Sequence, residues 1–508
     1  MATGDEQRGL RRQLLDSAAQ DDRTITPAIR KMPHPNSPHA RPLGKAVDWL
    51  HGAVLIPAFE AWFKRRRTIE YWRALERSQW HTPRQLEALQ GDRLQALIAH
   101  ADQTCPYYKE LWTAAGIDVR SVTSIQALES LPVTNRQDRR TNRDLIRSRA
   151  PGLRMFTKGT SGSTGEPSAI DYDHESYQRR IAGTYRGYAW AGAKPGVKTF
   201  YFWGAPLFKQ STLSKAKGEL YARLYRRHLY NCLAYREATF TDALESYEAS
   251  QAPVIVAYTR PLYEWARTLR EQQVRPTPPK SIIVGAEKLH SFQRKLIEEV
   301  FCAPVFETYG SREVMLIGAE CEQHNGLHIT AEHLIVELAD DNGKPVPPGV
   351  EGRVLVTDLF NYGAPYIRYD IGDRAVASER QCACGRGLPL LDRVVGRQLE
   401  VIVAPDGRRI PGELFPFLFL EECAVGRFQA IQVAPARLRL AVELRQDWPE
   451  AARAETMKRL QALVGPEMLI ELEIVDSIGL TPSGKLAVVQ NPWLESQRMV
   501  AEQARTMP

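Results

Sequence analysis

The feature that most constrains the fold is an alternation of strand-like and helix-like runs between residues 195 and 310. The apolar, β-rich runs VKTFYFWG, APVIVAY, KSIIVGAE and APVFETYG are separated by amphipathic runs such as LYEWARTLREQQ and SFQRKLIEEVF. Strands that alternate with helices of this length pack as βαβ units around a largely parallel sheet. The alternation therefore predicts an α/β fold. A chain of 508 residues, 43% of them hydrophobic, is long enough for more than one domain.

The residues before this alternation have a different composition, which predicts the structure of the first part of the chain. Residues 1–45 are polar and contain several prolines and histidines, so we expect them to be poorly ordered. Apolar residues then recur at helical spacing, and a proline at Pro106 interrupts them. Residues 46–150 are therefore predicted to form a helical opening.

The later part of the chain is predicted to form two domains. Residues 46–396, which include the helical opening, form a large α/β domain with a β-rich subdomain at residues 328–375. Asp341-Asn342-Gly343 within it is a strong signal for a hairpin turn. Residues 397–508 carry alternating runs such as RLRLAVELR and MLIELEIV, which predict a small α+β domain.

Charge and cysteine content narrow the class of protein. The net charge of +7 is mild over this length and suits an enzyme of anionic metabolites better than a nucleic-acid binder, which carries a clustered basic face. Seven cysteines, an odd number, do not suggest a disulfide framework. The first residues lack the basic-then-apolar pattern of a secretory signal. We therefore expect a cytoplasmic protein without a nucleic-acid partner.

The most apolar early stretch is Val47–Phe63, VDWLHGAVLIPAFEAWF, which continues directly into KRRR. It is short and interrupted by polar residues, so we expect no transmembrane segment. The favoured interpretation is a buried helix. The alternative is a helix on a membrane surface, with peripheral contact through residues 47–67, backed by Lys64–Arg67.

A glycine- and hydroxyl-rich run, TKGTSGSTGEPS, occupies residues 157–168. Its spacing excludes two common phosphate loops, because one needs a lysine directly after the last glycine and the other needs G-x-G-x-x-G. Glycines nevertheless let backbone N–H groups converge on an anion, and hydroxyls add neutral donors. The alternative is a flexible linker, which its position between the helical and α/β regions disfavours. The run therefore predicts an anion-binding loop.

Five motifs in order resemble those of the adenylate-forming superfamily of acyl-CoA synthetases, adenylation domains and luciferases. They are Thr160–Pro167 (TSGSTGEP), Tyr309–Glu313 (YGSRE), Arg368–Asp373 (RYDIGD), Gly396-Arg397, and Thr481–Lys485 (TPSGK). The runs HADQTCPYYKELWTAAGI, ECEQHNGLHI and CACGRGLP resemble its phenylacetate-CoA ligase and CapK-like branch. The resemblance covers roughly residues 70 to 495. It implies an adenylation domain followed by a small mobile C-terminal lid domain.

The resemblance implies an AMP-forming carboxylate ligase. In such enzymes a carboxylate attacks the α-phosphate of Mg-ATP and expels pyrophosphate, and the thiol of coenzyme A then attacks the acyl-adenylate and releases AMP. The implied ligands are ATP or AMP, Mg2+, coenzyme A and a small, possibly aryl, carboxylic acid. Two alternatives stay open. One is acyl transfer to an amine or hydroxyl in polysaccharide or secondary-metabolite biosynthesis; the other is a non-catalytic nucleotide- or zinc-binding interaction protein.

The resemblance assigns catalytic roles to Lys485, Glu313 and Thr160. Lys485 would reach both the substrate carboxylate and the α-phosphate, and Glu313 would bind Mg2+ through a hard anionic oxygen. The structural alternative for Glu313 is a solvated surface carboxylate. The loop that would hold the departing pyrophosphate consists of Thr160, Ser161, Gly162, Ser163, Thr164 and Gly165.

The adenosine half of the nucleotide would be bound by other matching positions. Tyr309 would stack on adenine, Asp373 would accept both ribose hydroxyls, and Arg397 would contact ribose or phosphate. A core tyrosine is the structural alternative for Tyr309. The remaining residues of the expected nucleotide site are Gly285, Ala286, Glu287, Gly310, Ser311 and Arg312.

The sequence departs from the superfamily pattern at three places. Ser168 stands where a lysine often ends the loop motif, so the charge on the triphosphate would be met by Lys158 or Arg312. Arg312 itself stands where the family often has a hydroxyl residue. Leu399 and Glu400 replace an acidic pair often found after the glycine-arginine motif. The hinge residue between the domains is therefore left open.

Cys321, His324, Cys382 and Cys384 provide four ligands, the number that a closed structural Zn2+ site needs. His328 competes with His324 for the fourth position. The resemblance supports such a site, because some ligases of this branch carry one. The alternative is a set of buried free cysteines with surface histidines, because Cys-x-Cys is tighter than the usual Cys-x2-Cys.

Three aromatic residues, Tyr201, Trp203 and Tyr258, are expected near the turn at Gly285. They would favour an aryl or apolar acid as the substrate. Plain core packing is the alternative for such a cluster.

Overall fold

The structure is a computed structural model of the chain. It describes residues 42–160, 168–204, 212–232, 238–397, 401–419, 422, 424–479, 486–494 and 496–497. The described residues from Ala46 onward form one compact unit. Among the described helices, none is both long and apolar enough to cross a membrane.

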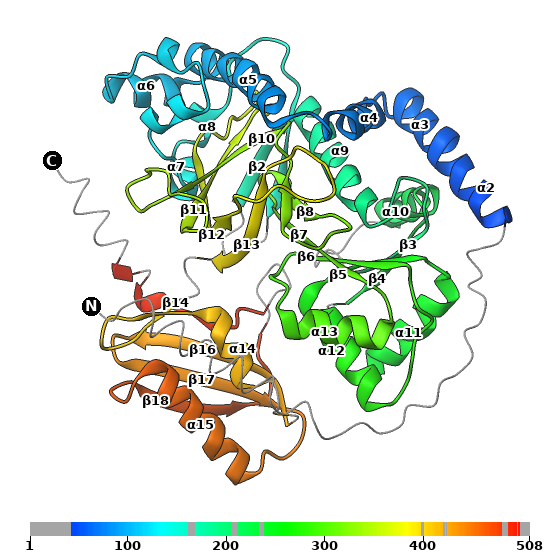
Figure 1. The fold of residues 1–508 in the computed structure, drawn as a ribbon, viewed down its shortest axis with the longest axis vertical. Coiled ribbons are helices and arrows are strands. Elements are labelled where there is room, and N and C mark those ends of the chain that lie inside the picture. Colours follow the sequence, from blue (N-terminus) through cyan, green and yellow to red (C-terminus); the bar gives the residue numbers. More distant parts are fainter. Residues whose placement is uncertain are drawn as a thin grey trace. The chain divides into compact units, whose positions relative to one another are not determined.

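One mixed sheet of 11 strands organises most of this unit (Figure 1). Its strands are β3 (Thr199–Trp203), β4 (Arg227–Asn231), β5 (Val254–Tyr258), β6 (Ser281–Gly285), β7 (Val305–Ser311), β8 (Met315–Glu320), β9 (Leu327–Ile329), β10 (Leu334–Ala339), β11 (Glu351–Asp358), β12 (Tyr369–Ala377) and β13 (Leu390–Arg397). They lie in the order β10-β11-β12-β13-β9-β8-β7-β6-β5-β3-β4.

The parallel part of the sheet contains β4, β3, β5, β6 and β7, which pair in this order. Phe200, Ile255 and Ile282 of these strands share one buried core with the helices that connect them. The predicted alternation of strands and helices, and with it the α/β fold class, is confirmed. The helices of this region are α10 (Thr212–Leu224), α11 (Ala238–Ser250), α12 (Thr259–Glu271) and α13 (Ser291–Phe301).

The antiparallel part of the sheet begins where β8 turns back on β7. The turn predicted at Asp341–Gly343 forms after β10: the Gly343 N–H donates to the Asp340 carbonyl at 3.1 Å, and Ala339 pairs with Pro345 across it. The chain then returns as β11, antiparallel to β10. The predicted β-rich subdomain is therefore part of the same large sheet.

Helices open the chain, as predicted. A capping box at Thr82 and Gln85 starts the helix at residue 83, and the break at Pro106 is present because the next helix begins there. The opening helices are α2 (Pro42–Leu50), α3 (Ile56–Ala58), α4 (Thr68–Ser78), α5 (Pro83–Thr104), α6 (Pro106–Ala114), α7 (Arg136–Thr141) and α8 (Arg143–Ile146), with π-helical turns η3 (His51–Leu55) and η4 (Phe59–Phe63) and 3-10 turns η5 (Val119–Ser121) and η6 (Gln126–Ser130).

The stretch Val47–Phe63 is helical, but the favoured interpretation of a buried helix is wrong. Within it only Ile56 and Glu60 are buried, while Trp62 and Phe63 are among the most exposed apolar side chains of the described residues. Apolar composition predicted the helix, but it could not show that only one side of it meets other elements.

A two-stranded antiparallel hairpin flanks the glycine-rich loop. It consists of β1 (Met155–Thr160) and β2 (Ser168–Asp173), and Thr160 pairs with Ser168 at its end. Helix α9 (His174–Trp190) follows directly, capped by the Asp173 carboxylate, which accepts a hydrogen bond from the Ser176 N–H at 2.7 Å.

Beyond residue 397 the chain forms smaller sheets with a core of their own. That core contains only residues between Ile402 and Val489. The boundary predicted between residues 396 and 397 stays a prediction, with which these separate cores are compatible. The elements are β14 (Val401–Val403), β15 (Arg409–Pro411), η7 (Gly412–Leu414), α14 (Phe415–Leu418), β16 (Val425–Ala434), β17 (Arg437–Leu444), α15 (Glu450–Val464), β18 (Leu469–Val475) and β19 (Val489–Gln490).

Candidate functional site

Three predicted nucleotide-site residues from distant parts of the chain meet at the antiparallel part of the sheet. The Tyr309 hydroxyl of β7 donates a hydrogen bond to Oδ2 of Asp373 in β12 at 2.8 Å. Asp373 is also the backbone partner of Arg397 in β13. Two residues predicted to bind the two ends of adenosine are therefore in direct contact, and the third lies on the neighbouring strand.

Two glycines of this region allow close backbone packing. A Cβ on Gly310 would lie 2.1 Å from the carbonyl oxygen of Met315, on the strand that turns back. A Cβ on Gly285 would lie 2.4 Å from Thr308 Oγ1, whose hydroxyl donates to the Val284 carbonyl at 2.7 Å. Both positions therefore need glycine because any side chain would push the two strands apart.

The turn after β6 has a strained backbone. Ala286 adopts a φ of 69°, a left-handed conformation that costs energy for any residue other than glycine. Glu287 stabilises the turn, because its carbonyl accepts the Thr259 hydroxyl at 2.9 Å and its carboxylate accepts the Arg260 N–H at 3.1 Å. These contacts fix the turn at the carboxyl end of a parallel strand, where open α/β sheets bind ligands.

Glu313, the expected Mg2+ ligand, is half-buried among tyrosines. Burial, and then the negative charge of Glu313, raise the pKa of Tyr369. The hydroxyl of Tyr172, whose pKa is raised chiefly by burial, donates to the carbonyl of Arg312. This bond connects the strand after the glycine-rich loop to the YGSRE turn, and nothing in the sequence indicated it.

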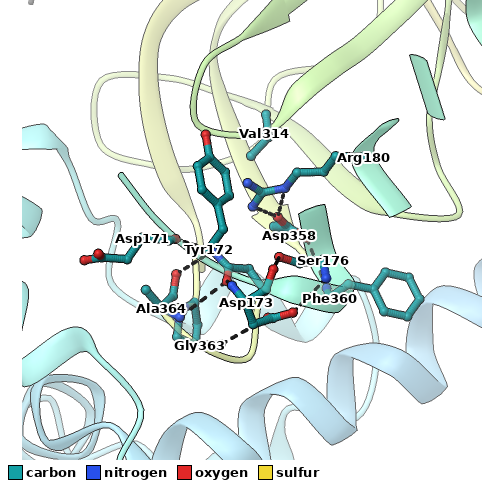
Figure 2. A network of polar contacts seen from close by, with 12 residues as sticks. Asp171, Tyr172, Asp173, Ser176, Arg180, Val314, Asp358, Phe360, Gly363 and Ala364 are labelled. Carbon is teal, nitrogen blue, oxygen red and sulfur yellow. Dashed lines mark hydrogen bonds and ion pairs between the residues drawn. The ribbon is translucent and has the colours of Figure 1, made fainter. Parts of the chain in front are cut away.

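A buried polar network fixes the same strand to the loop before β12 (Figure 2). Asp173 accepts a hydrogen bond from the Gly363 N–H at 3.2 Å, and burial raises the pKa of its carboxyl group. About two helical turns further along α9, the buried Arg180 forms an ion pair with Asp358. The network holds β2 and α9 against the segment between β11 and β12. The run of polar residues in DYDHE was its one sequence signal.

Several predicted site residues lie outside the described part of the chain. They include the loop positions Ser161, Gly162, Ser163, Thr164 and Gly165, the catalytic candidate Lys485, and the hinge positions Leu399 and Glu400. Of the two cations suggested for the triphosphate, Arg312 is exposed. Lys158 instead donates to the Tyr177 hydroxyl and lies over its ring, 4.0 Å from the centroid.

A second candidate site, made of three cysteines and a histidine, lies close to β9 and the segment before β13. One ligand atom from each of Cys321, His328, Cys382 and Cys384 lies within 4.8 Å of all the others. The Cys321 and Cys382 Sγ atoms are 3.6 Å apart, and Cys384 Sγ is 3.3 Å from His328 Nε2. Two thiolates on one tetrahedral Zn2+, each about 2.3 Å from the metal, stand ~3.8 Å apart.

The same group settles the choice that spacing left open. His328, not His324, is the histidine that the fold brings to the three cysteines. Its Nδ1 faces the Leu388 carbonyl at 3.4 Å, which leaves Nε2 toward the thiols. Burial lowers the pKa of His328 to about 4, so its ring is neutral, as a metal ligand must be. His324 instead places its Nδ1 3.3 Å from Glu320.

The aromatic residues suggested for the acyl pocket lie at the carboxyl ends of adjacent parallel strands. The rings of Trp203 and Tyr258 are 4.0 Å apart, and Tyr201 and Trp203 pack together against one face of the sheet. Tyr201 lies under the guanidinium of Arg227, 5.2 Å from the ring centroid. The acyl pocket predicted near these side chains and the Gly285 turn stays a prediction.

Comparison with known proteins finds one matching family model and several curated relatives. Residues 402–492 match the model of the CapK C-terminal domain. The chain is 26% identical over 418 residues to a phenylacetate-coenzyme A ligase of Thermus thermophilus, which covers 78% of this chain and 91% of the relative. It is 25% identical over 342 residues to the phenylacetate-coenzyme A ligase of Escherichia coli, covering 65% and 75%.

The fold agrees with solved structures of a related kind. A 2-hydroxyisobutyryl-CoA ligase in the postadenylation state, in complex with R3-HIB-AMP, superposes with a TM-score of 0.64 at 20% identity, over 82% of this chain and 92% of that chain. The same ligase in complex with 2-HIB-AMP and CoA gives a TM-score of 0.54 at 21% identity. The α/β fold with a C-terminal sheet region is therefore that of adenylate-forming CoA ligases.

Proposed function

We propose that this chain, a homologue of the phenylacetate-coenzyme A ligases with a CapK-type C-terminal region, is an AMP-forming acid–CoA ligase. It activates a carboxylic acid with ATP, releases pyrophosphate and transfers the acyl group to the thiol of coenzyme A. The reacting carboxylate, phosphate and thiol all come from the substrates. The protein therefore contributes mainly by positioning these groups and by placing hydrogen-bond donors and cations near the charge that develops during the reaction.

The observation that carries the proposal is the hydrogen bond between Tyr309 and Asp373, with Arg397 on the next strand. The Tyr309 hydroxyl holds one carboxylate oxygen of Asp373. A carboxylate held at this position is the kind of acceptor that ribose hydroxyls need. An adenine ring against Tyr309 fits the same arrangement. These three residues belong to three different motifs, each of which predicted a nucleotide contact. In the structure they lie on strands of the same part of the sheet.

Roles for the remaining residues follow from their chemistry. Glu313 would hold Mg2+ against the phosphates, and the ion would neutralise charge on the leaving pyrophosphate. The hydroxyls and backbone N–H groups of Thr160–Gly165 would bind that pyrophosphate. Lys485 would bring its cation to the substrate carboxylate and the α-phosphate during adenylation.

We also propose a structural Zn2+ held by Cys321, His328, Cys382 and Cys384. The sulfur spacing fits a tetrahedral ion, and four protein ligands leave no open position for catalysis. Zinc there would crosslink the segment at Cys321 to the segment at Cys382 and stabilise that end of the large sheet.

A small carboxylic acid and coenzyme A are the proposed partners. An aryl or apolar acid is favoured by the packing of Trp203 against Tyr258. A cytoplasmic location is also proposed: none of the six described cysteines forms a disulfide bond, and disulfides form mainly in oxidising compartments.

The decisive experiment is pyrophosphate release over a panel of carboxylic acids, with and without CoA. Release that depends on one acid, followed by acyl-CoA formation, is the expected result. Release without acyl-CoA would redirect the acyl group to an amine or hydroxyl acceptor. If no acid supported release, the enzyme proposal would be wrong.

Lys485→Ala separates the two half-reactions. Adenylation should slow by at least about 100-fold because the cation at the reacting carboxylate and phosphate is lost. Thioester formation from supplied acyl-adenylate should be largely preserved. An equal loss in both half-reactions would contradict the role proposed for Lys485.

A further inference from the structure

The helical segment at residues 46–63 is firmly seated on the protein through one of its sides. The His51 ring hydrogen-bonds through Nδ1 to the Leu224 carbonyl of α10 at 3.0 Å. Gly52 packs against backbone, because a Cβ there would lie 2.4 Å from the Pro195 carbonyl oxygen. Ile56 is fully buried in a cluster that includes Tyr225. The position of this segment is therefore set by specific contacts.

A buried carboxylate strengthens this attachment. Glu60 is 2% exposed and accepts hydrogen bonds from the hydroxyls of Thr68, at 2.9 Å, and of Tyr221 and Tyr225. Arg66 also approaches it, at 3.9 Å. The acid ties the segment to α4 and α10. It is thus satisfied inside the protein and adds no negative charge to the outer surface.

The opposite side of the segment is apolar and has few protein neighbours. Of the 14 exposed large hydrophobic side chains in the described residues, seven belong to this one segment. Trp62 and Phe63 are 83% and 75% exposed. A concentration of this kind marks an interaction surface, because scattered single residues are the ordinary case. This apolar patch consists of Val47, Trp49, Leu50, Val54, Leu55, Trp62 and Phe63.

Positive charge adjoins the apolar patch. Lys64 and Arg65 follow it directly, and neither forms an ion pair with a described residue. Lys64 Nζ lies 5.6 Å from the Phe63 ring centroid, so cation and aromatic ring share one surface. The two acids between residues 46 and 65 are both compensated: Asp48 pairs with Arg226, and Glu60 is buried. The surface is therefore apolar and cationic.

We propose that residues 46–65 are a docking surface for a membrane that contains anionic phospholipid. Tryptophan and phenylalanine are favoured at the boundary between headgroups and acyl chains, and adjacent lysine and arginine are attracted to lipid phosphate. The helix lies on the membrane because it is held to the protein along its other side. The only partly exposed carboxylate that a second copy of this patch would offer to Lys64 and Arg65 is Asp48, which is already paired with Arg226.

Vesicle flotation with the full chain tests the proposal, using phosphatidylcholine vesicles with and without phosphatidylglycerol. The wild type should float with the anionic vesicles, and added salt should weaken binding because it screens the cations. Two double variants probe the two parts of the surface: Trp62→Ser with Phe63→Ser, and Lys64→Glu with Arg65→Glu. Each should reduce affinity by about tenfold or more.

Leu469→Ala is the matched control, because Leu469 is exposed but lies on β18, far along the chain from the patch. It should bind vesicles as the wild type does. Thermal unfolding of every variant checks that the fold is kept. The proposal is overturned if the wild type does not float, or if both double variants bind as well as the control. It is also overturned if the patch variants instead abolish a concentration-dependent self-association seen by light scattering.

Discussion

At the scale of single residues, Gly310 lies at a close approach between β7 and β8. Gly310→Ala should lower the free energy of unfolding by about 1–3 kcal/mol, because the new methyl group would overlap the Met315 carbonyl. Gly218→Ala is the matched control: its Cβ would meet no atom within 4 Å, on a helix interior where alanine is preferred. Denaturant unfolding measures both, and equal stability of the two variants would contradict the close approach.

The bond between Tyr309 and Asp373 allows a second test at this scale. Tyr309→Phe removes the hydroxyl that donates to the carboxylate, which is worth about 1.5 kcal/mol or more for a charged acceptor. The KM for ATP should rise about tenfold, with a smaller effect on kcat. Steady-state pyrophosphate release measures it. The control is Tyr247→Phe, whose hydroxyl donates to the Thr277 carbonyl away from the site, and it should leave the KM unchanged.

The sequence was sufficient to nominate residues but not always to choose between them. Tyr309 and Asp373 could be nominated because each lies in a recognisable motif. His324 and His328 could not be distinguished, since the choice depends on how β9 pairs. The register places His328 opposite Leu390, close to the segment that carries Cys382 and Cys384. A contact between strands some 60 residues apart leaves no trace in local spacing.

At the scale of elements, the cysteine cluster makes a prediction about metal content. The purified protein should carry about one Zn2+ per chain, and His328→Ala should lose it together with at least about 2 kcal/mol of stability. His324→Ala should keep the metal, because its ring faces Glu320. Elemental analysis and denaturant unfolding measure the two effects. Zinc retained in His328→Ala but lost in His324→Ala would reverse the assignment.

Helices and strands could be predicted where the segment was long enough to show a periodic pattern of hydrophobic residues. The strands β3, β5, β6 and β7 and the helices α12 and α13 appear where alternation placed them. The three-residue β9 could not be predicted, because it is too short to show a period and exists through pairing with β8 and β13. The helix around Ile56 was predicted, but its exposed side was not.

At the scale of the whole molecule, the chain contains separate hydrophobic cores. One lies entirely between Ile402 and Val489, and the described clusters of the large sheet end by Val394. A chain that ends at Arg397 should therefore stay folded, since it keeps all 11 strands of the large sheet. It should release no pyrophosphate, because it lacks Lys485.

Circular dichroism and thermal unfolding of the truncated chain test this prediction, with the full chain as the control. A truncated chain that is unfolded would show that the two cores depend on each other, and the boundary would have to be abandoned. The overall order of strands could not be read from the sequence at all. Strand β3, for example, pairs directly with β5, although β4 lies between them in the sequence, and that choice is made by packing.

The two π-helical turns in the segment at residues 46–63 have a consequence for chain length. Gly52, Ile56 and Glu60 repeat every four residues on the protein side. On the other side Leu50 and Val54 are four residues apart, and Trp62 follows eight residues later. An α-helix turns about 100° per residue, so four residues overshoot a full turn by about 40°. The wider turns η3 and η4 offset that drift. The number of residues between these contacts is therefore constrained more tightly than the identity of the exposed residues. The fold should tolerate many substitutions at Val54. Deleting Ala53 would instead rotate Trp62 toward the protein.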